Sequence, residues 1–279
     1  MVVSAGLAAC QTAWLKANPY HEYEEIELET PVMTGEDYNR LIKTHARPYI
    51  VSLETNEGGL LLYGAEHTKD PKNKQIEDIQ ERFEKFRPSV VLVEGRMGFF
   101  YGGIEDSIKK FGENGLLYFL AKQEKITAYT WETSLDSEVA SVLKKHEPKR
   151  VALFYILRPY FGNLRHGKPT DPDAKVAGTL SRRTKIKGLE DTFSSVKDID
   201  DLWMKDFKGK PDWRDTSDEY GLPCYLKTIA ADSNAARDEH FARIIIDLVR
   251  KGERVFAMAG SSHAVKLDKT LRTALEKQV

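Results

Sequence analysis

The stretch Gly59-Leu60-Leu61-Leu62-Tyr63-Gly64-Ala65-Glu66-His67-Thr68 decides the predicted fold. Its apolar run has the length and composition of a buried strand, and a carboxylate and an imidazole follow where that strand would reach the surface. A matching stretch, Val255-Phe256-Ala257-Met258-Ala259-Gly260-Ser261-Ser262-His263, lies near the end of the chain. Both stretches contain Gly-x-x-His at the exit of an apolar strand. We therefore expect two strands that deliver histidines in the same way.

Strand and helix patterns alternate around the first stretch. Residues 49–54 and the first stretch together predict a β-hairpin with a glycine-containing turn. A helical stripe follows at residues 76–86, and the β-branched run at 90–93 comes after Pro88. Because a strand, a helix and a strand follow one another, a parallel crossover is predicted.

The alternation continues along the chain. We expect helices at 104–111, 116–123 and 137–146, a strand at 125–131, and either a strand or a buried helix at 151–157. Asn234 is expected to cap a late helix that ends at Gly252 and leads into the last strand. The predicted class is α/β, with a central, mostly parallel sheet flanked by helices, an N-terminal hairpin and an inserted, partly helical lid.

The length of 279 residues suits a single α/β domain over residues 1–279. Residues 160–224 break the alternation, since they are rich in Gly, Pro, Asp and Lys with scattered aromatic residues. They are expected to form an insertion or lid, or else a second small core. The net charge of −1 gives no basic field, so no nucleic-acid partner is predicted.

The N-terminus allows two interpretations. Leu7-Ala8-Ala9-Cys10 resembles the lipobox of a bacterial lipoprotein signal peptide, although the basic segment that usually precedes it is missing. In that case residues 1–20 are a signal remnant and linker, Cys10 carries a lipid anchor, and the protein lies at the bacterial cell envelope. Otherwise the segment is a plain apolar N-terminus, Cys10 is incidental, and the protein is cytoplasmic.

Polar side chains follow the predicted strands at one edge of the sheet. The carboxyl ends of parallel strands share an edge, and ligands bind in the crevice outside it. We therefore expect these residues to converge there: Glu66, His67, Glu94, Glu132 and His263 at strand exits, and Arg237 and His240 in the first turns of the late helix. Arg158, after the apolar run at 151–157, is a further candidate for substrate binding.

Four of these motifs together resemble the TraB/Tiki superfamily, which is similar to the erythromycin-esterase and ChaN-like haem-binding lipoproteins. The resemblance covers residues 48–104 and 230–275, and the motifs are Gly64-Ala65-Glu66-His67, Val93-Glu94-Gly95, Arg237-Asp238 and Gly260-Ser261-Ser262-His263. It implies an α/β core whose pocket contains His67, Glu94, Arg237 and His263. For Tiki members it also implies metal-dependent peptide hydrolysis.

Three classes of function are compatible with these residues. In the first, His67, Glu94 and His263 hold Mn, Co or Zn, and Glu66 or Glu132 takes a proton from the metal-bound water. A metal-free hydrolase would use His67 as general base, oriented by Glu94, with His263 or Arg237 stabilising an oxyanion. The second class is a binding protein for haem or a small ligand, and the third is an interaction domain. The predicted substrate is a small molecule or a peptide.

Overall fold

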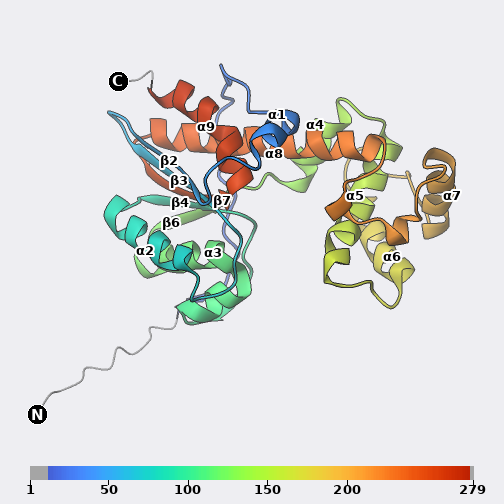
Figure 1. Cartoon of the computed structure of the whole chain (residues 1–279), viewed down its shortest axis with the longest axis horizontal. Coiled ribbons are helices and arrows are strands. Elements are labelled where there is room, and N and C mark those ends of the chain that lie inside the picture. Colours follow the sequence, from blue (N-terminus) through green and yellow to red (C-terminus); the bar gives the residue numbers. More distant parts are fainter. Residues whose placement is uncertain (1–11, 277–279) are drawn as a thin grey trace, which may run out of the picture. The chain divides into compact units, whose positions relative to one another are not determined.

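The computed structural model describes residues 12–276, so Cys10 and the lipobox-like stretch lie outside the described residues. The chain divides into two compact units (Figure 1): the residues up to Thr133 together with those from Asp238 onward, and Ser134–Arg237. The second unit is longer at both ends than the expected insertion at 160–224.

The first unit is built on a five-stranded sheet in the order β2-β3-β7-β4-β6. Only β2 runs antiparallel to its neighbour, β3, and the remaining pairs are parallel. The predicted α/β class with a mostly parallel sheet is therefore confirmed. The bounds are Tyr49–Glu54 for β2, Gly59–Ala65 for β3, Val90–Val93 for β4, Thr127–Thr130 for β6 and Arg254–Gly260 for β7.

Helices cover both faces of this sheet, as Figure 1 shows. Leu61 and Tyr63 of β3 belong to the same core cluster as the buried residues of α2 (Lys74–Phe86) and α3 (Ile104–Gln123). Leu60 and Leu62 instead share a cluster with residues of α8 (Tyr225–Arg250) and α9 (Ser261–Leu275). Because alternate strand residues point to opposite faces, buried strands in such a sheet are apolar throughout.

Helix α3 joins the two helices expected at 104–111 and 116–123. Its path is broken at Gly112, whose φ of 67° and ψ of −151° lie outside the helical region. Such backbone angles are open to glycine almost alone. The break restarts the helix at Glu113 and Asn114, and this places both residues at the first turn of its second half.

The late helix begins earlier than expected, and Asn234 is not its cap. Helix α8 starts at Tyr225, nine residues before Asn234. Leu226 and Ile229 are fully buried and share the core of the second unit, so they extend the apolar face of the helix toward its N-terminus. Arg237 is consequently a residue of the middle of α8 and not of its first turn.

The second unit is helical. The run at 151–157, for which the sequence allowed two readings, is a helix, and it lies at the centre of this unit's core. The elements are α4 (Leu135–Leu143), α5 (Pro148–Asn163), α6 (Pro172–Arg183) and α7 (Val196–Asp206), with 3-10 turns at Leu164–His166, Trp213–Asp215 and Asp218–Tyr220. The remaining elements belong to the first unit: β1 (Thr12–Trp14), α1 (Gly35–Leu41) and β5 (Phe100–Gly102).

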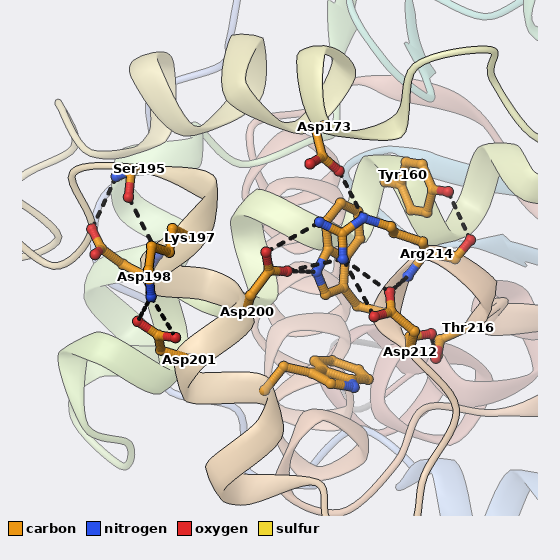
Figure 2. A network of polar contacts seen from close by, with 12 residues as sticks. Tyr160, Asp173, Ser195, Lys197, Asp198, Asp200, Asp201, Asp212, Arg214 and Thr216 are labelled. Carbon is orange, nitrogen blue, oxygen red and sulfur yellow. Dashed lines mark hydrogen bonds and ion pairs between the residues drawn. The ribbon is translucent and has the colours of Figure 1, made fainter.

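Arg214 links two helices and a 3-10 turn of the second unit (Figure 2). The Arg214 guanidinium donates to Asp173 at 2.7 Å, to Asp200 at 2.9 Å and to Asp212 at 3.2 Å. The hydrogen bond to Asp173, together with the other two carboxylates, raises the pKa of Arg214 despite its partial burial. The neighbouring Trp213 is fully buried and also donates to Asp200. This network ties α6, α7 and the 3-10 turn together, so its role is structural.

Candidate functional site

Three parallel strands end side by side at the edge where the sequence predicted a site. Ala65 of β3 pairs with Gly260 of β7, and β4 lies on the other side of β7. The chain leaves β3 and β4 toward α2 and α3, whereas β7 leads directly into α9 on the opposite face. Strand exits that diverge in this way open a crevice at the edge of the sheet.

His67 is held in this crevice by a buried carboxylate. Its Nδ1 lies 2.6 Å from Glu113 Oε1, and the Thr68 amide donates to Glu113 Oε2 at 3.2 Å. The Glu113 side chain is 3% exposed and the His67 side chain 66% exposed. A carboxylate only accepts, so Nδ1 carries the hydrogen and Nε2 of the neutral imidazole is the free acceptor. Glu113 thus fixes both the tautomer and the orientation of an accessible histidine.

The same carboxylate sets the basicity of the histidine. The hydrogen bond to Glu113 raises the pKa of His67 above 6.5, against the opposing effect of desolvation, and the charges of Glu113 and Glu94 add to the increase. Glu94, at the exit of β4, is therefore close enough to His67 to act on it electrostatically. A raised pKa strengthens the imidazole as a proton acceptor.

The residues at the break in α3 contact the segments that follow both β3 and β4. A Cβ on Gly112 would lie 2.8 Å from the Thr68 carbonyl oxygen, so this glycine allows the close approach of α3 to the exit of β3. The next residue, Glu113, binds His67, and Asn114 Oδ1 accepts from the Glu94 amide at 2.8 Å. Sequence patterns did not predict a role for Gly112, Glu113 or Asn114. The available signal was Gly112-Glu113-Asn114-Gly115, a polar, glycine-flanked interruption between two helical segments.

The free side of the imidazole faces the start of α9. A Cβ built on Gly260 would lie 2.8 Å from His67 Nε2, so the ring lies against the backbone of this residue. Gly260 is the N-cap of α9 and has no side chain to accept from the first-turn amides. The first amides of a helix have no partner within the helix, and they favour negative charge. A base and a set of anion-binding amides therefore lie next to each other.

A pocket of about 540 Å³ opens beside His67. It is lined by His67, Thr68, Lys69, Glu94, Gly95, Arg96, Met97, Phe111, Gly112, Glu113 and Asn114. Within residues 12–276 neither Lys69 nor Arg96 forms an ion pair, although Arg96 is held by a hydrogen bond from its Nε to the Asn18 carbonyl at 3.2 Å. The pocket thus offers a base, two cations, the carboxylates of Glu94 and Glu113, and the apolar surface of Met97 and Phe111.

His263 forms a second histidine–carboxylate pair outside this lining. Its Nδ1 hydrogen-bonds Asp238 of α8, which is 1% exposed and also accepts from Lys266 at 3.1 Å. Burial alone would raise the pKa of Asp238, but its bonds to His263 and Lys266 outweigh that effect and lower it. The His263 ring lies 5.2 Å from the buried Trp131 ring, which follows β6. His263 is therefore directed toward α8 and the exit of β6.

The predicted metal ligands do not form a ligand set in this arrangement. No group of three or more His, Cys, Asp or Glu side chains within residues 12–276 is placed to hold a metal ion. His67 and Glu94 share the pocket, but His263 is not part of its lining. Among the described residues, the side chains therefore do not fit the predicted His₂Glu centre.

The other predicted site residues lie in different surroundings. The Glu66 side chain is exposed while its peptide group is clamped by Gln75 of α2. Nδ1 of His240 lies 2.8 Å from the Tyr23 hydroxyl oxygen. Burial lowers the pKa of His240 to about 4, and the Glu132 charge opposes this decrease only in part. In the second unit, Arg158 pairs with Glu138 at 3.1 Å, and Arg237 reaches Asn234 Oδ1 at 3.5 Å. None of the five lines the pocket.

No protein-family model, curated protein or solved structure matches this chain.

Proposed function

We propose that the protein hydrolyses an ester or amide bond of a small molecule or peptide, with His67 as a metal-free general base. One observation carries this proposal: Glu113 holds Nδ1 of His67 at 2.6 Å, while Nε2 lies against Gly260 at the start of α9. A base oriented by a third group and placed beside oxyanion-binding amides is the minimal apparatus for attack on a carbonyl.

The reaction follows from the positions of these groups. His67 Nε2 accepts a proton from water as the oxygen attacks the carbonyl carbon. Negative charge then develops on the carbonyl oxygen, and the first-turn amides of α9 stabilise it. Glu113 stabilises the imidazolium that forms, and His67 returns the proton to the leaving group as the tetrahedral intermediate collapses. The role first assigned to Glu94, that of orienting His67, passes to Glu113.

The two cations of the pocket indicate which substrates fit best. Neither Lys69 nor Arg96 pairs with a carboxylate among residues 12–276, so both can bind an anionic group, and Arg96 is already held in place through Asn18. In this proposal they bind the anionic group of the substrate, whereas Arg237 was predicted to stabilise an oxyanion. The preferred substrate therefore carries a carboxylate or phosphate in addition to the scissile bond.

Membership of the TraB/Tiki superfamily stays a prediction, as does a lid role for residues 160–224. The resemblance supports hydrolysis, but the His67–Glu113 pair supports a different base arrangement from the metal centre that it implies.

The test is a panel of aryl esters and peptides with neutral or anionic acyl groups, assayed with the wild type and with His67→Ala. Each assay is run with chelator and with added Mn²⁺, Co²⁺ or Zn²⁺. We expect turnover that resists chelation, favours anionic substrates and falls about 100-fold or more in His67→Ala. Activity only with metal would refute the metal-free mechanism. No turnover together with a Soret band on adding haem would favour the haem-binding alternative.

A further inference from the structure

A small separate sheet presents an apolar face to solvent. Strands β1 and β5 pair antiparallel, with Trp14 opposite Phe100. These two side chains are each 4% exposed and stack at 4.3 Å, so they point into the core. Tyr101 alternates with Phe100 in β5 and is 64% exposed, while Leu15 directly follows β1 and is 76% exposed and Phe99 directly precedes β5 and is 64% exposed. We call these three residues the β1–β5 face.

The composition of this face is unusual for a surface in water. An antiparallel sheet with one solvated face normally carries polar residues there. Seven large hydrophobic residues are exposed within residues 12–276, and three of them lie on the β1–β5 face. Clusters of this kind indicate a contact surface, whereas scattered exposed hydrophobic residues do not.

The position of the face in the chain indicates what covers it. Leu15 lies five residues after Cys10, the residue that a lipobox would lipidate. Five extended residues span at most about 18 Å, so a lipid on Cys10 would hold this face next to the bilayer surface. The exposed Lys16 follows Leu15 and suits an anionic headgroup. Leucine and aromatic side chains beside a lysine are the composition of interfacial membrane contacts.

We propose that the β1–β5 face docks on a lipid bilayer at the boundary between headgroups and acyl chains. No helix within residues 12–276 is long and apolar enough to cross a membrane. Contact through this face would add a second, reversible attachment to any lipid on Cys10. Phe99 lies three residues after Arg96 of the pocket, so docking brings the entrance of the pocket close to the membrane.

The test uses the full chain carrying Cys10→Ser, which removes any lipid attachment and isolates the contribution of the protein surface. Its partition onto phosphatidylcholine vesicles, with and without phosphatidylglycerol, is measured by flotation. The test variant adds Leu15→Ser, Phe99→Ser and Tyr101→Ser. The control instead adds Leu41→Ser, Ile42→Ser and Met204→Ser, three exposed hydrophobic residues elsewhere on the chain. All six side chains are exposed, so both variants are expected to keep the melting temperature.

The proposal predicts that the test variant partitions on the order of 100-fold less than the parent on both kinds of vesicle, while the control is unchanged. Equal binding by the test variant and the parent would overturn it. Binding confined to phosphatidylglycerol and abolished by salt would also overturn it, because that result assigns attachment to charge. So would a parent that is dimeric in light scattering and does not bind vesicles, since a second copy would then cover the face.

Discussion

Replacing Gly260 by alanine tests whether His67 must lie against the start of α9. A Cβ at this position would be 2.8 Å from His67 Nε2, and ordinary contact begins at 3.4 Å, so the imidazole must move by about 0.6 Å. The backbone angles of Gly260, φ −61° and ψ 149°, are open to alanine, so the substitution causes no backbone strain. The perturbation is therefore directed at the base and not at the fold.

The expected effect on catalysis is large compared with the effect on stability. Misplacement of a catalytic group by about 1 Å costs roughly 100-fold, and 0.6 Å should cost about 10- to 100-fold in kcat/KM. Loss of a glycine N-cap to alanine lowers the free energy of unfolding by about 1 kcal/mol at most. The assays are kcat/KM on the best ester of the panel and urea unfolding.

Gly59→Ala is the matched control at the opposite end of β3. Its Cβ would lie 2.9 Å from Glu54 Oε2, which is also the end of a flexible side chain, but no pocket residue is nearby. We expect both variants to fold, and only Gly260→Ala to lose activity. Full activity in Gly260→Ala would refute the reasoning, because His67 would then not depend on its position against α9. An equal loss in Gly59→Ala would assign the effect to the strand and not to the base.

Two further predictions concern stability. Gly112→Ala should lower the free energy of unfolding, measured by urea titration, by about 2–3 kcal/mol, because alanine would have a φ of 67° and its Cβ would lie 2.8 Å from the Thr68 carbonyl oxygen. The control is Gly178→Ala in α6, whose added Cβ would have no neighbour within 4 Å, and this variant should be neutral or slightly more stable. His240 has a pKa of about 4 in the folded protein, below its value of about 6.5 in the unfolded chain. The stability that depends on neutral His240 is therefore fully present above pH 6.5 and is lost as the pH falls toward 4. From about pH 7 to about pH 5 this amounts to roughly 2 kcal/mol, and His240→Phe should show a correspondingly flatter dependence of unfolding free energy on pH. An unchanged slope in that variant would assign the dependence to other groups.

The sheet could be predicted because its strands carry local signals. The apolar runs at 59–65, 90–93 and 255–259 are bounded by Gly, Pro or charged residues, and buried parallel strands require that composition. Because Glu94 and His67 both follow the carboxyl ends of predicted parallel strands, the sequence placed them at the same edge of the sheet. The structure puts both in one pocket.

The partner of His67 could not be found in this way. Glu113 is 46 residues from His67 and sits inside a helix, where a glutamate is most often a solvated surface residue. Its burial depends on the break at Gly112, which only the packing of α3 against the exit of β3 explains. The histidine was predicted from its strand, whereas its partner depends on tertiary structure.

The extent of α8 was also beyond the local signals. Asn234 has the chemistry of a cap, and the apolar stripe after it was plain, so the helix was predicted to start there. Leu226 and Ile229 extend the helix because they pack into the separate core of the second unit. The sequence offered a second small core at 160–224, but the residue spacing around Asn234 does not show that the helix begins in it, so Arg237 was placed at the sheet edge.

The most direct measurement of the central claim is the pH dependence of kcat/KM for the wild type and for Glu113→Gln. Glu113 raises the pKa of His67, and the neutral base is the active form, so wild-type activity should rise with pH through that raised pKa. In Glu113→Gln the rise should move to lower pH, and the plateau should fall about 10- to 100-fold because the imidazolium loses its carboxylate. An unchanged midpoint and plateau in a folded Glu113→Gln protein would contradict the account.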